Sequence, residues 1–293
     1  MNAWALPTLF ALLLQLWLNF YALNRRPLRP LSPVLHGLLF SALLFTVGDL
    51  LASSFLRSSE ERWVGFFFLY SGLIFLGPAW WLLALRFSEA HELGLKFTRK
   101  RWTYLPLAVA IGLWAGLVLN PWHGQFLTPV VDGASVRHWM WWANATQSYL
   151  ILVGVSGLYG FLVFKTPPGV LRSRLIILLL ATLSTGLASA FYVFAPVSIP
   201  FDPTSIGVGI SSLLFIIGIY RTRLFALSPV AWREVMKHQP GGILVFGTEG
   251  QLLYANANAL KILGDPAIAA SAPILPLLAR VLHPPEDPSA SLD

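Results

Sequence analysis

Seven long apolar segments set the strongest limit on how this chain can fold. A bilayer core about 30 Å thick requires roughly 20 apolar residues per helix, and such segments cover residues 3–23, 34–56, 63–85, 102–119, 144–164, 173–194 and 204–220. Lipid offers the backbone no hydrogen-bond partners, so each segment must be helical. Only 11% of the 293 residues are charged, against about 25% in soluble domains. We therefore predict an all-α polytopic membrane protein with a seven-transmembrane helix bundle.

Basic residues are distributed unevenly between the connections. Three lie on one side of the bundle, at Arg57, Arg62 and Arg137. Fifteen lie in the alternate connections, and these are Arg25, Arg26, Arg29, Arg86, Lys96, Arg99, Lys100, Arg101, Lys165, Arg172, Arg174, Arg221, Arg223, Arg233 and Lys237. The positive-inside rule places the N-terminus outside and residue 221 onward in the cytoplasm. The net charge of +7 is then a topology signal, and we predict no nucleic-acid binding.

Sequence motifs for catalysis are incomplete. Residues 154–157, GVSG, resemble the nucleophile motif of intramembrane proteases, but the later segments contain no histidine base. Residues 91–95, HELGL, lack the second histidine of a zinc site, and we interpret them as a solvated loop. The last apolar segment has no lysine for a retinal Schiff base, and the chain has no cysteine. We predict no enzyme activity, no metal and no cofactor for this chain.

Polar residues inside or beside the spans are the candidates for a ligand site, because an ionisable group in lipid is costly. Asp49 is interpreted as lining an outward pocket, pairing with a neighbouring helix or carrying a proton, with a structural hydrogen bond as the alternative. His123 is either an interfacial loop residue or a ligand contact. Asp202 can cap the seventh helix or contact a ligand. The candidate ligand-binding residues are Asp49, Asn120, His123, Gln147, Tyr192 and Asp202, with Tyr149 as a further candidate.

The stretch GGILVFGTEGQLLYANANALKILG, residues 241–264, has a different pattern. Apolar runs at 243–246 and 252–254 flank a turn that contains two glycines. A helical spacing follows at Ala259, Leu260, Ile262 and Leu263. We predict a hairpin and a helix that are too small to hold a core of their own.

The order of several segments resembles a known family. These segments are GPAWWLLALRFSE (77–89), LPLAVAIGLWAGLVLNPWHGQF (105–126), FDPTSIGVGISSLLFIIGIYRTRLF (201–225) and the stretch after residue 240. Together they are similar to the N-terminal seven-transmembrane region of bacterial sensor histidine kinases, followed by the start of a PAS domain. Tyr254, Asn256 and Ala259 match the PAS step from strand to helix.

The resemblance implies a domain scheme. It assigns residues 1–223 to a seven-transmembrane sensor domain, 224–240 to a signalling connector helix, 241–283 to a partial, cytoplasmic PAS-like α+β domain and 284–293 to a disordered tail. The later PAS strands, a phosphoacceptor box and a nucleotide-binding segment have no counterpart before Asp293. We therefore expect a truncated PAS-like fragment and no kinase or cyclase domain in this chain.

The resemblance also implies a function. The chain would be the input module of a two-component-type receptor in the bacterial cytoplasmic (inner) membrane, relaying an extracytoplasmic or membrane signal through the seventh helix to a cytoplasmic PAS or output module. The implied partners are the lipid bilayer, a second copy in a homodimer, an unknown small molecule and a kinase or cyclase output module. Two alternatives stay open, namely a solute or ion transporter or channel component that uses Asp49, and an inert remnant of a truncated receptor.

Overall fold

The computed structural model describes residues 5–24, 32–55, 59–91, 93, 101–129, 135–194, 202–222, 224, 241–246 and 252–262. They fall into two units, within residues 1–226 and 227–293. The first unit contains α1 (Ala5–Asn24), α2 (Ser32–Leu50), the π-helix η1 (Leu51–Phe55), α3 (Ser59–Ala90), the 3₁₀-helix η2 (Arg101–Tyr104), α4 (Leu105–Val118), α5 (Asn120–His123), β1 (Leu127–Pro129), β2 (Ser135–Arg137), α6 (Trp139–Lys165), α7 (Val170–Phe194) and α8 (Thr204–Thr222).

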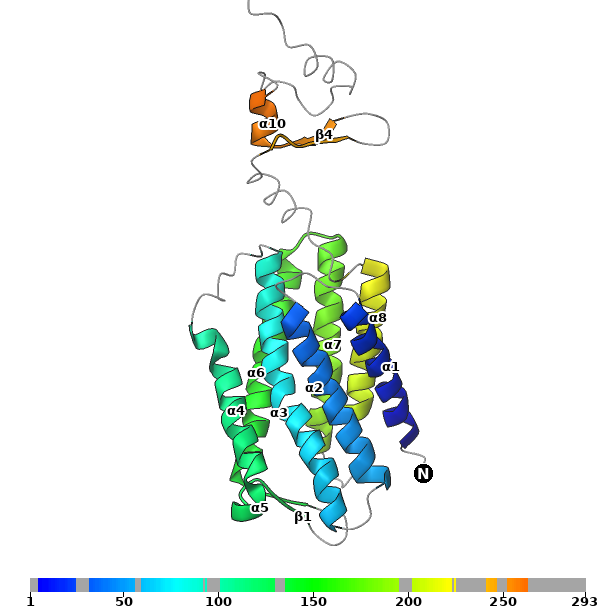
Figure 1. Ribbon diagram of the computed structural model, residues 1–293, viewed down its shortest axis with the longest axis vertical. Helices are drawn as coiled ribbons and strands as arrows, with labels where there is room; N and C mark the ends of the chain where they lie inside the picture. The colour runs from blue at the N-terminus through cyan, green and yellow to red at the C-terminus, as the bar shows by residue number, and fades with distance from the viewer. Residues whose placement is uncertain are drawn as a thin grey trace, which may run out of the picture. The chain divides into compact units, whose positions relative to one another are not determined.

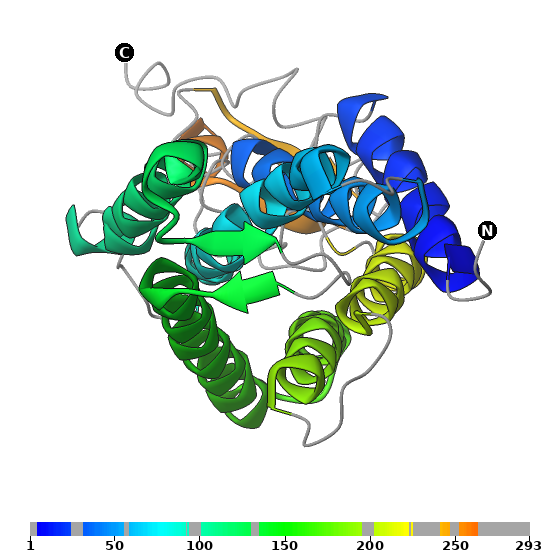
Figure 2. The same cartoon turned by 90° about the horizontal axis from the view of Figure 1, so that it is seen from below.

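In the described part of this unit, seven helices are long and apolar enough to cross a membrane, which confirms the predicted spans. They follow one another around a ring, and contacts between α1 and α8 close it (Figures 1 and 2). α3 also packs on α6, across the ring. At the end where α4 stops and α6 starts, the chain turns back through the antiparallel pair β1–β2. The predicted helical bundle is therefore present.

The exposed surface of the helices is strongly apolar. Leu23, Leu150 and Val153 are each 70% exposed, and Phe164 is 87% exposed. Water-soluble proteins rarely expose large contiguous apolar patches, whereas a lipid-facing surface is expected to be apolar. α1 shows the complementary pattern, because its buried residues recur every three or four positions, at Ala5, Thr8, Ala11, Gln15, Leu18 and Ala22.

Glycines let α2 and α3 approach each other very closely. A Cβ atom added at Gly48 would overlap the backbone of Leu69, and one added at Gly72 would overlap the backbone of Phe45. Gly65 on α3 faces Ala52 in the same way. Small residues at such contacts are the usual basis of tight helix packing in membranes, where dispersion forces replace the hydrophobic effect.

The second unit is a hairpin followed by a short helix. β3 (Leu244–Phe246) pairs antiparallel with β4 (Leu252–Ala255), and α10 spans Ala257–Ile262. The predicted hairpin and helix are confirmed, and Tyr254 lies within β4. The rest of the predicted connector up to residue 240, and the segment 263–293, lie outside the described residues.

One amide side chain holds this small unit together. Asn256 Oδ1 accepts hydrogen bonds from the backbone N–H groups of Ile243, at 2.9 Å, and Ala259, at 2.8 Å. Its Nδ2 donates to the carbonyl oxygen of Gly241 at 2.8 Å. Asn256 thus caps the start of α10 and ties it to the chain before β3.

Candidate functional site

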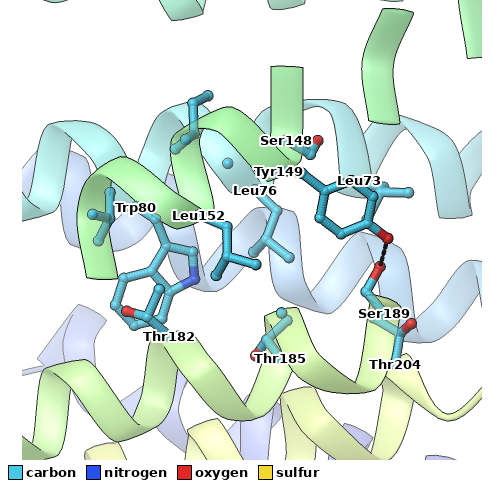
Figure 3. A pocket seen from close by; sticks show the side chains of 14 residues that line it. Leu73, Leu76, Trp80, Ser148, Tyr149, Leu152, Thr182, Thr185, Ser189 and Thr204 are labelled. Carbon is cyan, nitrogen blue, oxygen red and sulfur yellow. Dashed lines mark hydrogen bonds between the residues drawn. The ribbon is translucent and has the colours of Figure 1, made fainter. Parts of the chain in front are cut away.

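A small pocket lies between α3, α6, α7 and the beginning of α8 (Figure 3). Its volume is about 60 Å³, which is room for roughly four or five water molecules. Apolar side chains come from α3 and α6, and hydroxyl groups come from α6, α7 and α8. The lining includes Trp80, Tyr149, Leu152, Thr182, Ser189 and Thr204.

The pocket has hydroxyl groups toward both ends, because Thr182 lies beside Trp80 in Figure 3. Figure 3 shows Tyr149, Ser189 and Thr204 gathered at one end, and Trp80 beside Leu152 toward the other. The hydroxyl oxygens of Tyr149 and Ser189 lie 3.2 Å apart, within hydrogen-bonding distance, and so join α6 to α7. The pocket therefore offers hydrogen-bonding groups beside an apolar wall, as small-molecule sites do, but its volume is well below the range of roughly 300–1,000 Å³ found for drug-sized ligands.

A charged and aromatic cluster lies where α7 ends and α8 begins. The Cζ atom of Arg137 in β2 is 4.3 Å from the ring centre of Trp141 and 5.5 Å from that of Tyr192, which are cation–π distances. Asp202 lies within electrostatic range of Arg137 and Tyr192. Its Oδ1 accepts a hydrogen bond from the backbone N–H of Thr204 at 2.8 Å, so the predicted cap of the last helix is present. Burial raises the pKa of Asp202, and the contacts with Thr204 and Arg137 lower it less.

Asp49 joins three helices. Its Oδ2 accepts hydrogen bonds from Thr8 Oγ1 on α1, at 3.3 Å, and from the hydroxyl of Ser205 on α8. Two turns further along α1, Gln15 Nε2 donates to Thr46 Oγ1 on α2 at 2.8 Å. Hydroxyl donors make a buried carboxyl tolerable in a membrane segment. The interhelical hydrogen bond, one of the interpretations of Asp49, is therefore present, and its role as a ligand contact stays a prediction.

Three of the six candidate residues come together at this end of the bundle. Asp202 is within electrostatic range of both Asp49 and Tyr192. α8 connects them to the pocket, because Thr204 lines the pocket and the next residue, Ser205, bonds Asp49. The beginning of α8 is thus common to the cap, the pocket and the buried carboxyl.

The other three candidates bond to the backbone. Asn120 is buried, and its Nδ2 donates to the carbonyl oxygen of Leu127 at 2.7 Å while its Oδ1 accepts from Phe126 N at 2.7 Å. His123 Nδ1 accepts from the backbone N–H of Gln125 at 2.8 Å.

Gln147 Nε2 donates to the carbonyl oxygen of Pro106 at 2.7 Å and so links α6 to α4. None of Asn120, His123 and Gln147 lines the pocket between α3, α6, α7 and α8. Their ligand roles stay predictions.

A second polar cluster joins three helices at the opposite end of the bundle. Arg174 near the start of α7 donates from Nε to the carbonyl oxygen of Thr222, the last residue of α8, at 3.0 Å. Its Nη1 is 3.2 Å from Nε2 of His91, which follows α3. Nδ1 of His91 is 3.0 Å from the carbonyl oxygen of Phe87, so Nδ1 carries the proton and Nε2 accepts from Arg174.

The interpretation of HELGL as a solvated loop is wrong for His91. This residue is 4% exposed and its ring stacks on Phe87, with ring centres 4.1 Å apart. Burial lowers its pKa, the nearby Arg174 lowers it further, and the hydrogen bond with Phe87 raises it. Among the residues that the structure describes, no group of three or more His, Cys, Asp or Glu could hold a metal ion.

The sequence of the membrane unit matches one family model. The model describes the N-terminal 7TM region of histidine kinase, and it matches residues 7–229, more than half of the chain. The chain belongs to this family. No curated protein and no solved structure matches it. The histidine kinase 7TM region is a multi-pass membrane input region and is not a catalytic domain.

The matched residues 7–229 include the clusters around Asp202 and Arg174 and the lining of the pocket. The match ends before the hairpin of residues 241–262. The resemblance of the membrane region to sensor histidine kinases is therefore confirmed. The match does not reach Tyr254 and Asn256, so the PAS assignment of this hairpin stays a prediction.

Sequence reasoning missed several residues of these sites in the 7TM region. His91 had a signal in the spacing of Leu83, Phe87 and His91, which places them on one helical face and in the core. Thr182, Thr185 and Ser189 also repeat at helical spacing and line the pocket together. Nothing in the sequence marked Arg174 among the basic residues of its connection.

Proposed function

We propose that this 7TM region is the input unit of a receptor in which a small ligand occupies the pocket between α3, α6, α7 and α8. The main support is the position of two consecutive residues of α8. Thr204 lines the pocket, and Ser205 donates a hydrogen bond to Asp49. A ligand that displaces Thr204 would therefore also disturb the bonds that hold α8 to α2, and through Asp49 those to α1.

α8 is suited to carry this change to the other end of the bundle. It contains 19 residues and is therefore about 28 Å long. Its first turn lines the pocket, and its last residue, Thr222, is held by Arg174. We propose that a shift or rotation of α8 is passed to the segment 224–240 and from there to a cytoplasmic output module, in a homodimer.

The lining favours a small neutral amphiphile as the ligand. No charged side chain is found among the described residues that line this pocket, and a buried charge without a partner is strongly unfavourable. The hydroxyls of Tyr149, Ser189 and Thr204 would bond one polar group of the ligand. Trp80 and Leu152 would cover its apolar part.

A fusion protein tests this proposal. Residues 1–240 are joined to the catalytic part of a histidine kinase, and autophosphorylation is measured in proteoliposomes against a panel of small alcohols, ketones and amides. Ser189→Leu places an apolar side chain in the pocket. Gly157→Ala is the control, because an added Cβ there meets nothing within 4 Å and Gly157 is exposed.

We expect at least one compound to change phosphorylation, with about a tenfold loss of sensitivity in Ser189→Leu and none in Gly157→Ala. A response that persists in Ser189→Leu would overturn the assignment of the pocket. Solute flux in vesicles that is abolished by Asp49→Asn would favour the transporter alternative instead.

The proposed direction of signalling requires the N-terminus outside and the end of α8 in the cytoplasm of a bacterial inner membrane. The support is the bias of Lys and Arg toward alternate connections. A phosphatase reporter fused after Thr222 should be inactive, and a cytoplasmic fluorescent reporter at the same position should be bright. The reverse pattern would refute this topology.

A further inference from the structure

A larger pocket opens on the side of the bundle between α2, α3 and α4. Its volume is about 530 Å³, within the range of roughly 300–1,000 Å³ found for small-molecule sites. All of its described lining residues belong to candidate membrane spans, and Phe40 and Trp114 of this lining are exposed on the helix surface, so the pocket opens toward lipid. We call it the α2–α3–α4 groove, and its lining includes Gly37, Phe40, Phe68, Phe75, Leu107 and Trp114.

The polar groups of the groove already have partners. Ser41 Oγ donates to the carbonyl oxygen of Gly37 at 2.8 Å. Trp114 Nε1 donates to Ser71 Oγ at 3.1 Å and so joins α4 to α3. The other described residues of the lining are apolar. An occupant therefore needs no hydrogen-bonding groups inside the groove, and a hydrocarbon chain fits this requirement.

One end of the groove is marked by a cation. Leu82 and Leu107 line the groove. Arg86 lies about one helical turn beyond Leu82 on the same face of α3, and Tyr104 ends η2, three residues before Leu107. Arg86 Nη2 donates to the hydroxyl of Tyr104 at 3.0 Å. Arg86 also pairs with Glu89 at 3.5 Å, and its side chain is 30% exposed. Its guanidinium therefore keeps donors that a phosphate group can reach.

We propose that the α2–α3–α4 groove binds one acyl chain of an anionic membrane phospholipid, with the phosphate of that lipid at Arg86. Basic sites between transmembrane helices are known to select anionic headgroups. The site also borders the ligand pocket, because Phe75 and Ala79 line the groove while Leu76 and Trp80 line the pocket on another face of α3. A lipid in the groove would therefore bias the wall of the pocket.

Retention of lipid by the purified full chain tests this inference. The detergent-solubilised protein is stripped of lipid and mixed with phosphatidylglycerol or phosphatidylcholine of the same acyl chains. Bound lipid is then counted by native mass spectrometry. We expect wild-type protein to retain phosphatidylglycerol about fivefold better than phosphatidylcholine.

Two pairs of variants separate the groove from the cation. Gly37→Phe fills the groove, and Gly112→Phe on α4 is its control, since an added Cβ at either glycine meets nothing within 4 Å. Arg86→Gln removes the cation, and Arg221→Gln at the end of α8 is its control. Gly37→Phe should lose both lipids, and Arg86→Gln should bind the two lipids equally.

Each other result counts against the site. Wild-type retention in Gly37→Phe, or no preference for phosphatidylglycerol in the wild type, would overturn the inference. A change from dimer to monomer in Gly37→Phe with lipid retention intact would show that the groove is an interface between copies. Melting temperatures verify that the variants are folded. If Gly37→Phe does not fold, the smaller substitution Gly37→Leu replaces it in the same experiment.

Discussion

Nε of Arg174 lies 3.0 Å from the carbonyl oxygen of Thr222, so the start of α7 holds the end of α8. The last carbonyl groups of a helix have no partner within the helix, and a cation there also complements the negative end of the helix dipole. His91 adds α3 to the same contact. One buried guanidinium therefore fixes the helix end from which the chain continues toward residue 224.

Replacing Arg174 should loosen the last turn of α8. In Arg174→Gln the shorter side chain cannot reach both partners, and we expect a loss of about 1–2 kcal/mol of local stability. Hydrogen exchange of residues 218–224, followed by mass spectrometry, should speed up relative to wild type. Arg172→Gln is the control, and equal exchange in the two variants would contradict the role of Arg174.

Acidification should weaken the same cluster. The pKa of His91 is lowered by burial, so the folded protein binds the His91 proton less readily than the unfolded chain. The contribution of neutral His91 to the free energy of unfolding is therefore fully present above the ordinary pKa of 6.5. It is lost as the pH falls from there toward the pKa of His91 in the folded protein. The difference in Tm between wild type and His91→Gln should be largest near about pH 8 and shrink toward about pH 5. A constant difference would rule out this explanation.

The hydrogen bonds of Asp49 should be measurable by a matched pair of substitutions. Asp49→Asn keeps an acceptor oxygen for Thr8 and Ser205, whereas Asp49→Leu leaves both hydroxyls without it. We expect Asp49→Leu to lose about 0.5–2 kcal/mol more than Asp49→Asn. Unfolding in SDS titrations gives the two free energies, and equal values would mean that these bonds add nothing to stability.

The close contact of α2 and α3 should not tolerate a side chain. Gly72→Val would drive a Cβ into the backbone of Phe45, and overpacking of this kind costs about 1–3 kcal/mol or more. Gly112→Val places the same side chain in open space. The first variant should show a clearly lower Tm in detergent, and the second should match wild type within error.

Asn256 should decide whether the hairpin unit is formed. Asn256→Ala removes bonds to Gly241, Ile243 and Ala259 and should destabilise the unit by about 1–3 kcal/mol. Asn256→Asp keeps the acceptor and loses the donor to Gly241, so its effect should be intermediate. The rate of limited proteolysis within residues 241–262 of the full chain ranks the stability of this unit in wild type and the two variants.

The membrane helices were predictable because each one needs a long apolar run in its own stretch of chain. The residues at which the helices begin and end were less predictable. α6 begins at Trp139, before the predicted residue 144, since the interfacial tryptophans are already helical. α3 continues to Ala90 beyond the predicted residue 85, and this extension carries His91 to the buried cluster.

The pocket was not predictable, because it depends on which helices are neighbours. Tyr149 and Ser189 are 40 residues apart, and a serine or threonine in a membrane helix is often bonded only to its own backbone. Thr182, for example, donates to the carbonyl oxygen of Leu178 while also lining the pocket. Asp49 was noticed because a carboxyl in lipid is unusual. Its partners, Thr8 and Ser205, are ordinary residues in the sequence.

The glycines at positions 48, 65 and 72 restrict how the helices of this 7TM region can move. Two helices whose backbones are in contact cannot rotate against each other without first moving apart. α2 and α3 should therefore keep the same packing against each other in every functional state. Gly207 brings α8 just as close to the backbone of α7 at Ser184. α7 and α8 should therefore move together, relative to the hydrogen bond between Ser205 and Asp49 that joins α8 to α2.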